Sequence, residues 1–389
     1  MIVSVDQLRQ AARGTLPRWL FDYVDGGAYS EATLRRNRDA LAERHLLPFV
    51  LRGVARPDAG ASILGVRQPF PIGLAPVGMA GMLDAQGEIA AARAATALGV
   101  QMCVSHFSIC SIEEIARAVD PAFLMFQLYI FRDRAVTEDM VRRAWAAGVR
   151  TLVVTVDTPV TPLRERDVRN GFRQLSRLSL RHIGQMLPRP GWTWRMVRRG
   201  HCVIGNLVPY DMGTTLFSQA AAISRSLDPA IGWDDMAWLR TIWKGRLVVK
   251  GVMQPADVAT CADLGLDGVV LSNHGGRQLD GSASAVDVLE AGIRAANARI
   301  QILVDGGFRY GGDVAKALML GAAGVMIGRP WAYALAANGE KGVTDVLKYF
   351  RDGLLSTMTL LGAADLGALR GGRKSLLLEA RQTTSFDEE

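Results

Sequence analysis

The chain has 389 residues, of which 49% are hydrophobic and 21% charged, a balance that allows a large buried core and excludes extended disorder. The formal net charge is +7, and seven arginines with no acidic residue between Arg173 and Arg199 account for all of it. The chain has no apolar stretch of membrane-spanning length, no apolar leader and no C-x-x-C pair, so we expect a cytoplasmic protein without a metal site.

Short apolar runs rich in Val, Ile and Leu recur along the chain, as expected for parallel strands covered on both faces. Amphipathic, alanine-rich stretches separate them, and eight strands alternating with helices predict a closed α/β barrel, the (β/α)8 or TIM barrel fold. The strands are predicted at residues 71–76, 101–106, 123–129, 151–157, 246–252, 268–273, 301–307 and 324–330.

We expect one domain over residues 1–389, with a barrel core at about 70–335. The first 65 or so residues are predicted to form a helical N-terminal cap, and residues 343–361 a terminal helix. The step from the fourth to the fifth strand is much longer than the others. It predicts a long insertion after strand four, with its basic part at about 172–210.

Active sites of such barrels lie at the C-terminal ends of the strands, so the polar residues at those ends are the candidates. The glycines after strands seven and eight, with Arg309 and Arg329, favour a phosphate group, because glycine allows close approach of backbone N–H groups. His274 follows strand six between Asn273 and two glycines and is a candidate base, with Asp157 on strand four to orient it.

Two further features suggest the ligand. Arg277 and Arg164 can both face the barrel mouth, and with Tyr23 or Tyr129 they describe a site for a small carboxylate. Lys250 stands inside an apolar strand and needs an anionic partner there. It fits a Schiff-base lysine and a lysine that stabilises an electron-rich cofactor ring equally well. No G-x-G-x-x-G follows a strand, so a Rossmann nicotinamide site is not supported.

The motifs, taken in order, resemble the FMN-dependent L-2-hydroxy acid oxidases and dehydrogenases. They are LPRWLFDYVDGGA, IGLAPVGM, SIEE, FQLY, TVDTP with RERD, LVVKG, SNHGGRQLDG, LVDGGFRYGGDVAKALMLGA and IGRP, and they run over roughly positions 16 to 362. The resemblance implies that the chain uses FMN to oxidise a small L-2-hydroxy acid to its 2-oxo acid. A proton would leave either the α-carbon or the hydroxyl, the latter with hydride transfer to the flavin.

The resemblance also implies roles for individual residues. His274 is expected as the base paired with Asp157, and Lys250 as the charge beside the flavin N1 and O2 atoms. Arg164, Arg277 and Tyr23 are expected to bind the substrate carboxylate, and Tyr129 to contact the substrate oxygen. Phe107 stands where plant glycolate oxidases carry tryptophan, which argues against glycolate. The expected FMN site is Ala75, Pro76, Val77, Ser105, Gln127, Thr155, Lys250, Ser272, Asp305, Gly306, Gly307, Arg309, Gly328 and Arg329.

The basic insertion bears on the electron acceptor. Arg173, Arg177 and Arg181 form an i, i+4, i+8 stripe, and Trp192 and Trp194 follow, which is typical of a segment lying on an anionic membrane. The alternative is a loop that packs on its own protein or covers the active site, and nothing else supports nucleic acid. Leu175, Leu178, Ile183, Met186 and Leu187 fall largely on the other side of that stripe.

The insertion, RERD and Gly78 resemble the bacterial membrane-associated (S)-mandelate and L-lactate dehydrogenases, which reduce a membrane quinone. We therefore expect a dehydrogenase that passes electrons to a quinone or another respiratory acceptor, peripheral on the inner face of the cytoplasmic membrane and a homo-oligomer, as the family tends to tetramers. The alternatives are a soluble oxidase that produces hydrogen peroxide and a flavin-free phosphate-binding lyase that uses Lys250. Gly78, Met79 and Phe107 suggest room for a larger side chain, and lactate stays open.

Overall fold

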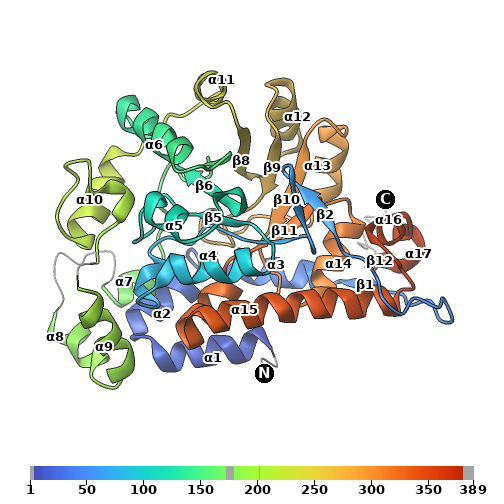
Figure 1. The fold of residues 1–389 in the computed structure, drawn as a ribbon, viewed down its shortest axis with the longest axis horizontal. Helices are drawn as coiled ribbons and strands as arrows, with labels where there is room; N and C mark the ends of the chain where they lie inside the picture. Colours follow the sequence, from blue (N-terminus) through green and yellow to red (C-terminus); the bar gives the residue numbers. More distant parts are fainter. Residues whose placement is uncertain (1–3, 172–178, 201, 380–389) are drawn as a thin grey trace, which may run out of the picture.

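A closed barrel of eight parallel strands organises the chain in the computed structural model, which describes residues 4–171, 179–200 and 202–379 (Figure 1). The strand order around the barrel is β10–β11–β4–β5–β6–β7–β8–β9, so the predicted fold is confirmed. Most strands end one to three residues sooner than predicted. The strands are β4 (Ile72–Leu74), β5 (Met102–Val104), β6 (Leu124–Leu128), β7 (Thr151–Thr155), β8 (Arg246–Val252), β9 (Gly268–Leu271), β10 (Gln301–Asp305) and β11 (Gly324–Ile327).

The interior of the barrel is filled by apolar side chains, so it is a core and not a channel. The turn of a small hairpin, β2 (Ala61–Ile63) and β3 (Val66–Gln68), plugs the N-terminal end with Ile63 and Leu64. Each strand adds one side chain to this core, from the strand itself or from the residue after it: Ala75, Cys103, Met125, Val153, Val248, Val270, Leu303 and Met326. With that end closed, the opposite end is left for chemistry.

Helices surround the strands and bury the second face of the sheet. In α4 the row of alanines is buried, which lets the helix lie close to α15. The helices that alternate with strands are α4 (Gly87–Ala97), α5 (Ile112–Ala118), α6 (Arg134–Ala146), α11 (Trp233–Ile242), α12 (Pro255–Asp263), α13 (Leu289–Ala296), α14 (Gly311–Met319) and α15 (Arg329–Leu360), with single 3-10 turns at Ala80–Met82 and Pro121–Phe123.

The predicted helical cap is present before the barrel as α1 (Val5–Thr15), α2 (Arg18–Asp25) and α3 (Ala32–Ala42). The predicted terminal helix is the second half of α15, which continues from the eighth barrel helix across non-helical residues at Asn338 and Gly339. Beyond it lie α16 (Leu366–Gly371) and α17 (Arg373–Leu376), and β12 (Leu377–Glu379) pairs with β1 (Arg44–Leu46).

The long connection between β7 and β8 folds into helices at one end of the molecule (Figure 1). These are α7 (Glu165–Arg169), α8 (Leu180–Met186), α9 (Pro190–Arg199) and α10 (Leu216–Ser226), with a 3-10 turn at Gly205–Leu207. The connection runs from the end of β7 at Thr155 to the start of β8 at Arg246, as the predicted strands imply, and its predicted basic part at about 172–210 overlaps α8 and α9. Arg173, Leu175, Arg177 and Leu178 of the predicted stripe lie outside the described residues.

One expectation about this connection is wrong. Trp192 does not face outward with Trp194, because it is buried and its indole Nε1 donates to the carbonyl oxygen of Met82 at 2.8 Å. Trp194 is exposed. Helix α9 therefore docks one side on the loop after β4 and presents the other to the outside. Among the helices of the described residues, none is long and apolar enough to cross a membrane.

Candidate active site

A cavity of about 400 Å³ opens at the C-terminal ends of the barrel strands. Nearly all predicted site residues line it, although they come from distant parts of the chain. Asp157 and Ser272 are absent from that lining and lie behind it, against His274 and Lys250. The predicted residues in the lining are Tyr23, Ala75, Pro76, Val77, Ser105, Phe107, Gln127, Tyr129, Thr155, Arg164, Lys250, His274, Arg277, Asp305, Gly306, Gly307, Arg309, Gly328 and Arg329.

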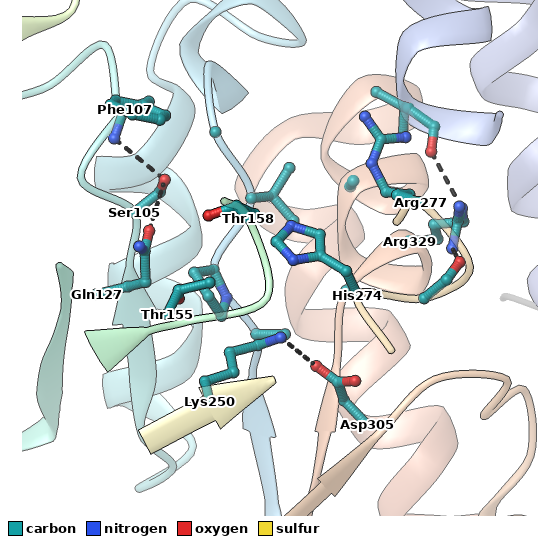
Figure 2. Close-up of a pocket in the computed structure, with 18 of the residues that line it drawn as sticks. Ser105, Phe107, Gln127, Thr155, Thr158, Lys250, His274, Arg277, Asp305 and Arg329 are labelled. Carbon is teal, nitrogen blue, oxygen red and sulfur yellow. Dashed lines mark hydrogen bonds and ion pairs between the residues drawn. The ribbon is translucent and has the colours of Figure 1, made fainter. Parts of the chain in front are cut away.

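Buried polar atoms with no partner in the described part of the chain lie on different sides of the cavity, at the ends of β6, β7 and β10. Within the described residues, Gln127 Nε2, Thr155 Oγ1 and Asp305 Oδ1 have no hydrogen-bond partner. Ser105 Oγ donates to Gln127 Oε1 at 3.3 Å, which fixes the amide (Figure 2). Since an unpaired buried polar atom costs free energy, this set of donors and acceptors fits a polar ring system bound in the cavity.

Lys250 lies on the cavity floor, buried, with its ammonium 3.0 Å from Asp305 and 2.8 Å from Ser272 Oγ (Figure 2). Burial by itself would lower the pKa of Lys250, but the Asp305 and Asp157 carboxylates outweigh it and hold the pKa above its usual value. The lysine is therefore a cation and unsuited to Schiff-base formation, which needs a neutral amine. Ser272 Oγ accepts from Lys250 Nζ and so orients the lysine, and its contact with the cofactor stays a prediction.

His274 lies at the centre of the cavity in the view of Figure 2. Its Nδ1 is 2.9 and 3.2 Å from the two carboxylate oxygens of Asp157, as the sequence predicted. Burial would raise the pKa of Asp157, but His274 and Lys250 keep it below its usual value, so Asp157 is ionised. A carboxylate on Nδ1 fixes the tautomer and leaves Nε2 as the nitrogen that accepts a proton.

A cationic group occupies another side of the cavity. Nη1 of Arg277 donates to the carbonyl oxygens of Tyr23 and Gly26, and its guanidinium lies over the Tyr23 ring at 5.1 Å. Nη2 of Arg164 is 3.4 Å from the Arg277 carbonyl oxygen. The predicted carboxylate-binding residues are thus brought together at the junction of α2, the loop after β7 and the loop after β9.

The anion-binding end predicted after β10 and β11 is also formed. Gly306 and Gly307 have φ angles of 95° and 88°, which favour glycine. Arg309 and Arg329 both line the cavity, and burial lowers the pKa of Arg329 to about 10, because a desolvated guanidinium is costly without an anion nearby. Buried arginines beside exposed backbone N–H groups fit a phosphate.

The insertion contributes an apolar wall that no sequence pattern indicated. Phe107 and Tyr129 stack at 4.8 Å, and Ile204, Ile223 and Leu227 line the cavity with them. A backbone hydrogen bond from the N–H of Arg132 to the carbonyl oxygen of Ser226 holds the end of α10 beside β6. Because no periodic pattern connects such a loop to the barrel, only the fold reveals these residues.

A group of hydrogen bonds to Asp25, which the sequence analysis missed, supports the segment that binds Arg277. The buried Asp25 carboxylate accepts from Arg9 Nε and Nη2 at 2.5 and 2.7 Å, from Arg166 Nη1 at 2.7 Å and from the Tyr333 hydroxyl at 2.7 Å. Burial would raise the pKa of Asp25, but these donors hold it far below its usual value. This Asp25 cluster ties α1, α7 and α15 to the end of α2, where Arg277 and Arg329 also bind.

A barrel rim that joins a phosphate-binding end to a buried lysine, a histidine–aspartate pair and an arginine group fits an enzyme with a phosphorylated ligand and an anionic substrate. Comparison with known proteins identifies it further. Residues 12–375 match the family model described as FMN-dependent dehydrogenase, and the chain belongs to that family.

The relatives agree with this assignment. An L-lactate dehydrogenase of Caulobacter vibrioides is 45% identical over 371 residues, covering 95% of this chain and 96% of the relative. The structure of a monotopic membrane protein, (S)-mandelate dehydrogenase, matches with a TM-score of 0.92 at 37% identity, covering 97% of this chain and 100% of that one. A mandelate oxidase structure matches with a TM-score of 0.83 at 36% identity, over 95% of this chain and 98% of that one.

These comparisons confirm the predicted family, the oxidoreductase class and the FMN cofactor. The residues present fit that cofactor: an anion-binding end, buried polar atoms around the cavity that lack a partner in the described residues, and a buried cation on the floor. The alternative of a flavin-free lyase gains no support from them.

Proposed function

We propose that the chain oxidises an L-2-hydroxy acid to the corresponding 2-oxo acid. The observation that carries the proposal is the placement of His274, with Asp157 behind it, in one cavity with the Arg164 and Arg277 side chains. A 2-hydroxy acid has its carboxylate one bond from the carbon that is oxidised, so a base and an arginine pair on the same rim match it. The names of the relatives, L-lactate and mandelate dehydrogenases, support this substrate class.

We assign the residues of the site the following roles in this reaction. Arg164, Arg277 and Tyr23 bind and orient the carboxylate, and Tyr129 contacts the substrate oxygen. His274 accepts a proton at Nε2, from either the α-carbon or the hydroxyl, and Asp157 stabilises the resulting imidazolium. FMN, when bound, supplies the oxidant. Lys250 would hold a fixed positive charge near it, which favours the reduced form.

An anaerobic visible spectrum before and after addition of L-mandelate or L-lactate tests this proposal. We expect the flavin absorbance to bleach with an L-2-hydroxy acid and not with the D-enantiomer. The variant His274→Gln, loaded with FMN, should bleach at least 100-fold more slowly, since general base catalysis contributes about 100- to 10,000-fold. Loaded wild-type protein whose spectrum stays unchanged with every L-2-hydroxy acid tried would refute the proposal.

We further propose that the electrons pass to a quinone and that the enzyme lies peripherally on the inner face of the cytoplasmic membrane. Large apolar side chains of α8, α9 and the residue that follows α8 are mostly exposed. The exposed fractions are 87% for Leu180, 77% for Leu187, 61% for Trp194 and 73% for Val197. Exposed Arg181 and Arg198 lie among them. Apolar and basic side chains on one surface favour an anionic membrane, and one structural relative is a monotopic membrane protein.

Sedimentation with phosphatidylglycerol vesicles tests this surface. We expect the wild type to pellet and the double variant Trp194→Ser/Val197→Ser to stay in the supernatant. The matched control is Val50→Ser/Leu51→Ser, which removes two apolar side chains that are more exposed, 78% and 100%, from a loop at the other end of the molecule (Figure 1). Equal pelleting of all three proteins would contradict the proposal.

The acceptor and the assembly need separate measurements. Reduction of a soluble quinone analogue in step with substrate oxidation supports a dehydrogenase, whereas stoichiometric hydrogen peroxide would favour the soluble oxidase. We propose a homotetramer, and light scattering on detergent-free protein distinguishes it from a monomer of 42.1 kDa.

A further inference from the structure

The turn that carries His274 has an unusual backbone. His274, Gly275 and Gly276 have successive φ angles of 56°, 64° and 75°, all in the left-handed region. For the two glycines this costs little, but for histidine it costs about 1 kcal/mol or more. Such a turn keeps its shape only when neighbouring groups hold it. The groups that hold it therefore determine where the imidazole lies.

Two carbonyl oxygens of the turn are held by the N-terminal segment and by the start of α15. Gly276 O accepts from Ala28 N at 2.9 Å, and Gly275 O accepts from Arg329 Nη1 at 2.9 Å. From within the turn, Gly276 N donates to the side-chain oxygen of Asn273 at 3.1 Å. The Asn273 amide therefore connects the His274 turn to whatever residue binds that amide.

Asn273 is held in turn by Asn37 of α3. The two amides form a reciprocal pair: Asn37 Nδ2 donates to Asn273 Oδ1 at 2.9 Å, and Asn273 Nδ2 donates to Asn37 Oδ1 at 2.8 Å. Both residues are buried, at 1% and 5% exposure. A second bond from Asn273 Nδ2 to Ala283 O, at 2.9 Å, completes the set. Loss of the Asn37 amide would leave buried donors and acceptors on Asn273 unpaired.

The same residue also abuts the anion-binding glycines. A Cβ atom placed on Gly307 would lie 2.0 Å from the carbonyl oxygen of Asn37, and one on Gly306 would lie 3.4 Å from its side-chain Cγ. Asn37 therefore contacts the His274 turn on one side and the Gly306–Gly307 backbone on the other. Through this one residue, the base and the phosphate-binding end share a support.

We propose that Asn37 is a positioning residue for the oxidation. It sets the position of the His274 turn relative to the glycines that bind the cofactor phosphate. Asn37 itself does not line the cavity, so it acts through the turn and the glycines. The inference rests on the role of His274 given under the proposed function. Hydride or proton transfer is steep in distance, so a shift of about 1 Å between base and cofactor can slow the reaction roughly 100-fold.

The test compares Asn37→Ala and Asn37→Asp with wild type in stopped-flow flavin reduction. Asn37→Asp keeps the volume but places a carboxylate oxygen where Asn273 Oδ1 had a donor. We expect the reduction rate at saturating 2-hydroxy acid to fall roughly 10- to 100-fold in both variants. The substrate concentration for half-maximal rate should change less than about 3-fold, since Arg277, which binds the carboxylate, is held by other residues.

The matched control is Gln68→Ala. Gln68 and Gln101 form another buried amide contact, with Gln68 Nε2 donating to Gln101 Oε1 at 2.8 Å and Gln101 N donating to Gln68 Oε1 at 3.1 Å, at the opposite end of the barrel. It should lose thermal stability as Asn37→Ala does and keep the wild-type reduction rate. A rate that stays at the wild-type value in the Asn37 variants, or that falls equally in Gln68→Ala, would overturn the inference. A wild type that is not reduced at all would instead overturn the proposed function.

Discussion

Replacing Asp25 with asparagine should destabilise the protein far more than a typical charge removal. The Asp25 carboxylate is 4% exposed and receives four hydrogen bonds, three of them from the guanidinium groups of Arg9 and Arg166. Asparagine keeps the size but replaces one oxygen by an NH2 group that faces a cationic donor. Breaking a buried, hydrogen-bonded ion pair costs about 3–5 kcal/mol. Because Arg9 and Arg166 are themselves partly exposed and regain water, we expect a loss at the lower end, about 3 kcal/mol.

Urea unfolding of the FMN-loaded protein, followed by tryptophan fluorescence, measures this loss. The control is Asp267→Asn, whose carboxylate also lies between two arginines, Arg240 and Arg246, but is 24% exposed. Surface pairs of that kind contribute about 1 kcal/mol or less. A loss below about 1 kcal/mol for Asp25→Asn, or equal losses for the two variants, would refute the argument from burial.

The same carboxylate gives a pH dependence. Its pKa is far below the usual value in the folded state, so the unfolded state binds the proton more readily. The contribution is therefore complete at neutral pH and is lost as the pH falls below about 4 toward the folded pKa. Asp25→Asn should flatten the stability curve in that acidic range and leave its shape near neutral pH unchanged.

Three further predictions concern other positions. Asp157→Asn should lower the rate of flavin reduction roughly 100-fold or more, because it removes the anion that stabilises the His274 imidazolium, with stopped-flow reduction as the assay. Burial lowers the pKa of His106 to about 3 from its usual 6.5, so stability should fall between pH 6.5 and 3 by up to about 1.4 kcal/mol per pH unit. Urea unfolding across that range should show a flatter curve for His106→Gln, and an unchanged slope would contradict the assignment. Gly307→Ala should release FMN and lose more than about 2 kcal/mol of stability, because φ is 88° and the new methyl group would overlap the carbonyl oxygen of Asn37. The fluorescence of released flavin measures the loss of FMN.

The barrel was predictable because its strands are buried on both faces and therefore stand out as uninterrupted runs of Val, Ile and Leu. The rim residues followed from the rule that chemistry gathers at the strand ends, which brought His274, Asp157 and Lys250 together before any distance was known. The family motifs added the residues that we expect to form the FMN site.

What could not be predicted depends on contacts between distant segments. Trp192 and Trp194 are two residues apart in one helix and therefore point in different directions, but the sequence of α9 does not say which direction meets Met82. Asp25 was visible as part of a motif, but its partners Arg166 and Tyr333 lie 141 and 308 residues away. Ile223 and Leu227 belong to a segment whose place over the cavity only the fold reveals.

The dependence of the rim on the N-terminal cap also bears on how the enzyme is made. The cap is synthesised first, yet its bonds to Arg277 and Arg329 span 251 to 305 residues. While the chain is on the ribosome, the end of α2 lacks these partners until the last barrel strands have emerged. Contacts of such sequence separation form slowly, so the rim is completed late in folding. Cofactor capture should then follow chain release, and refolding experiments should show secondary structure well before FMN binding.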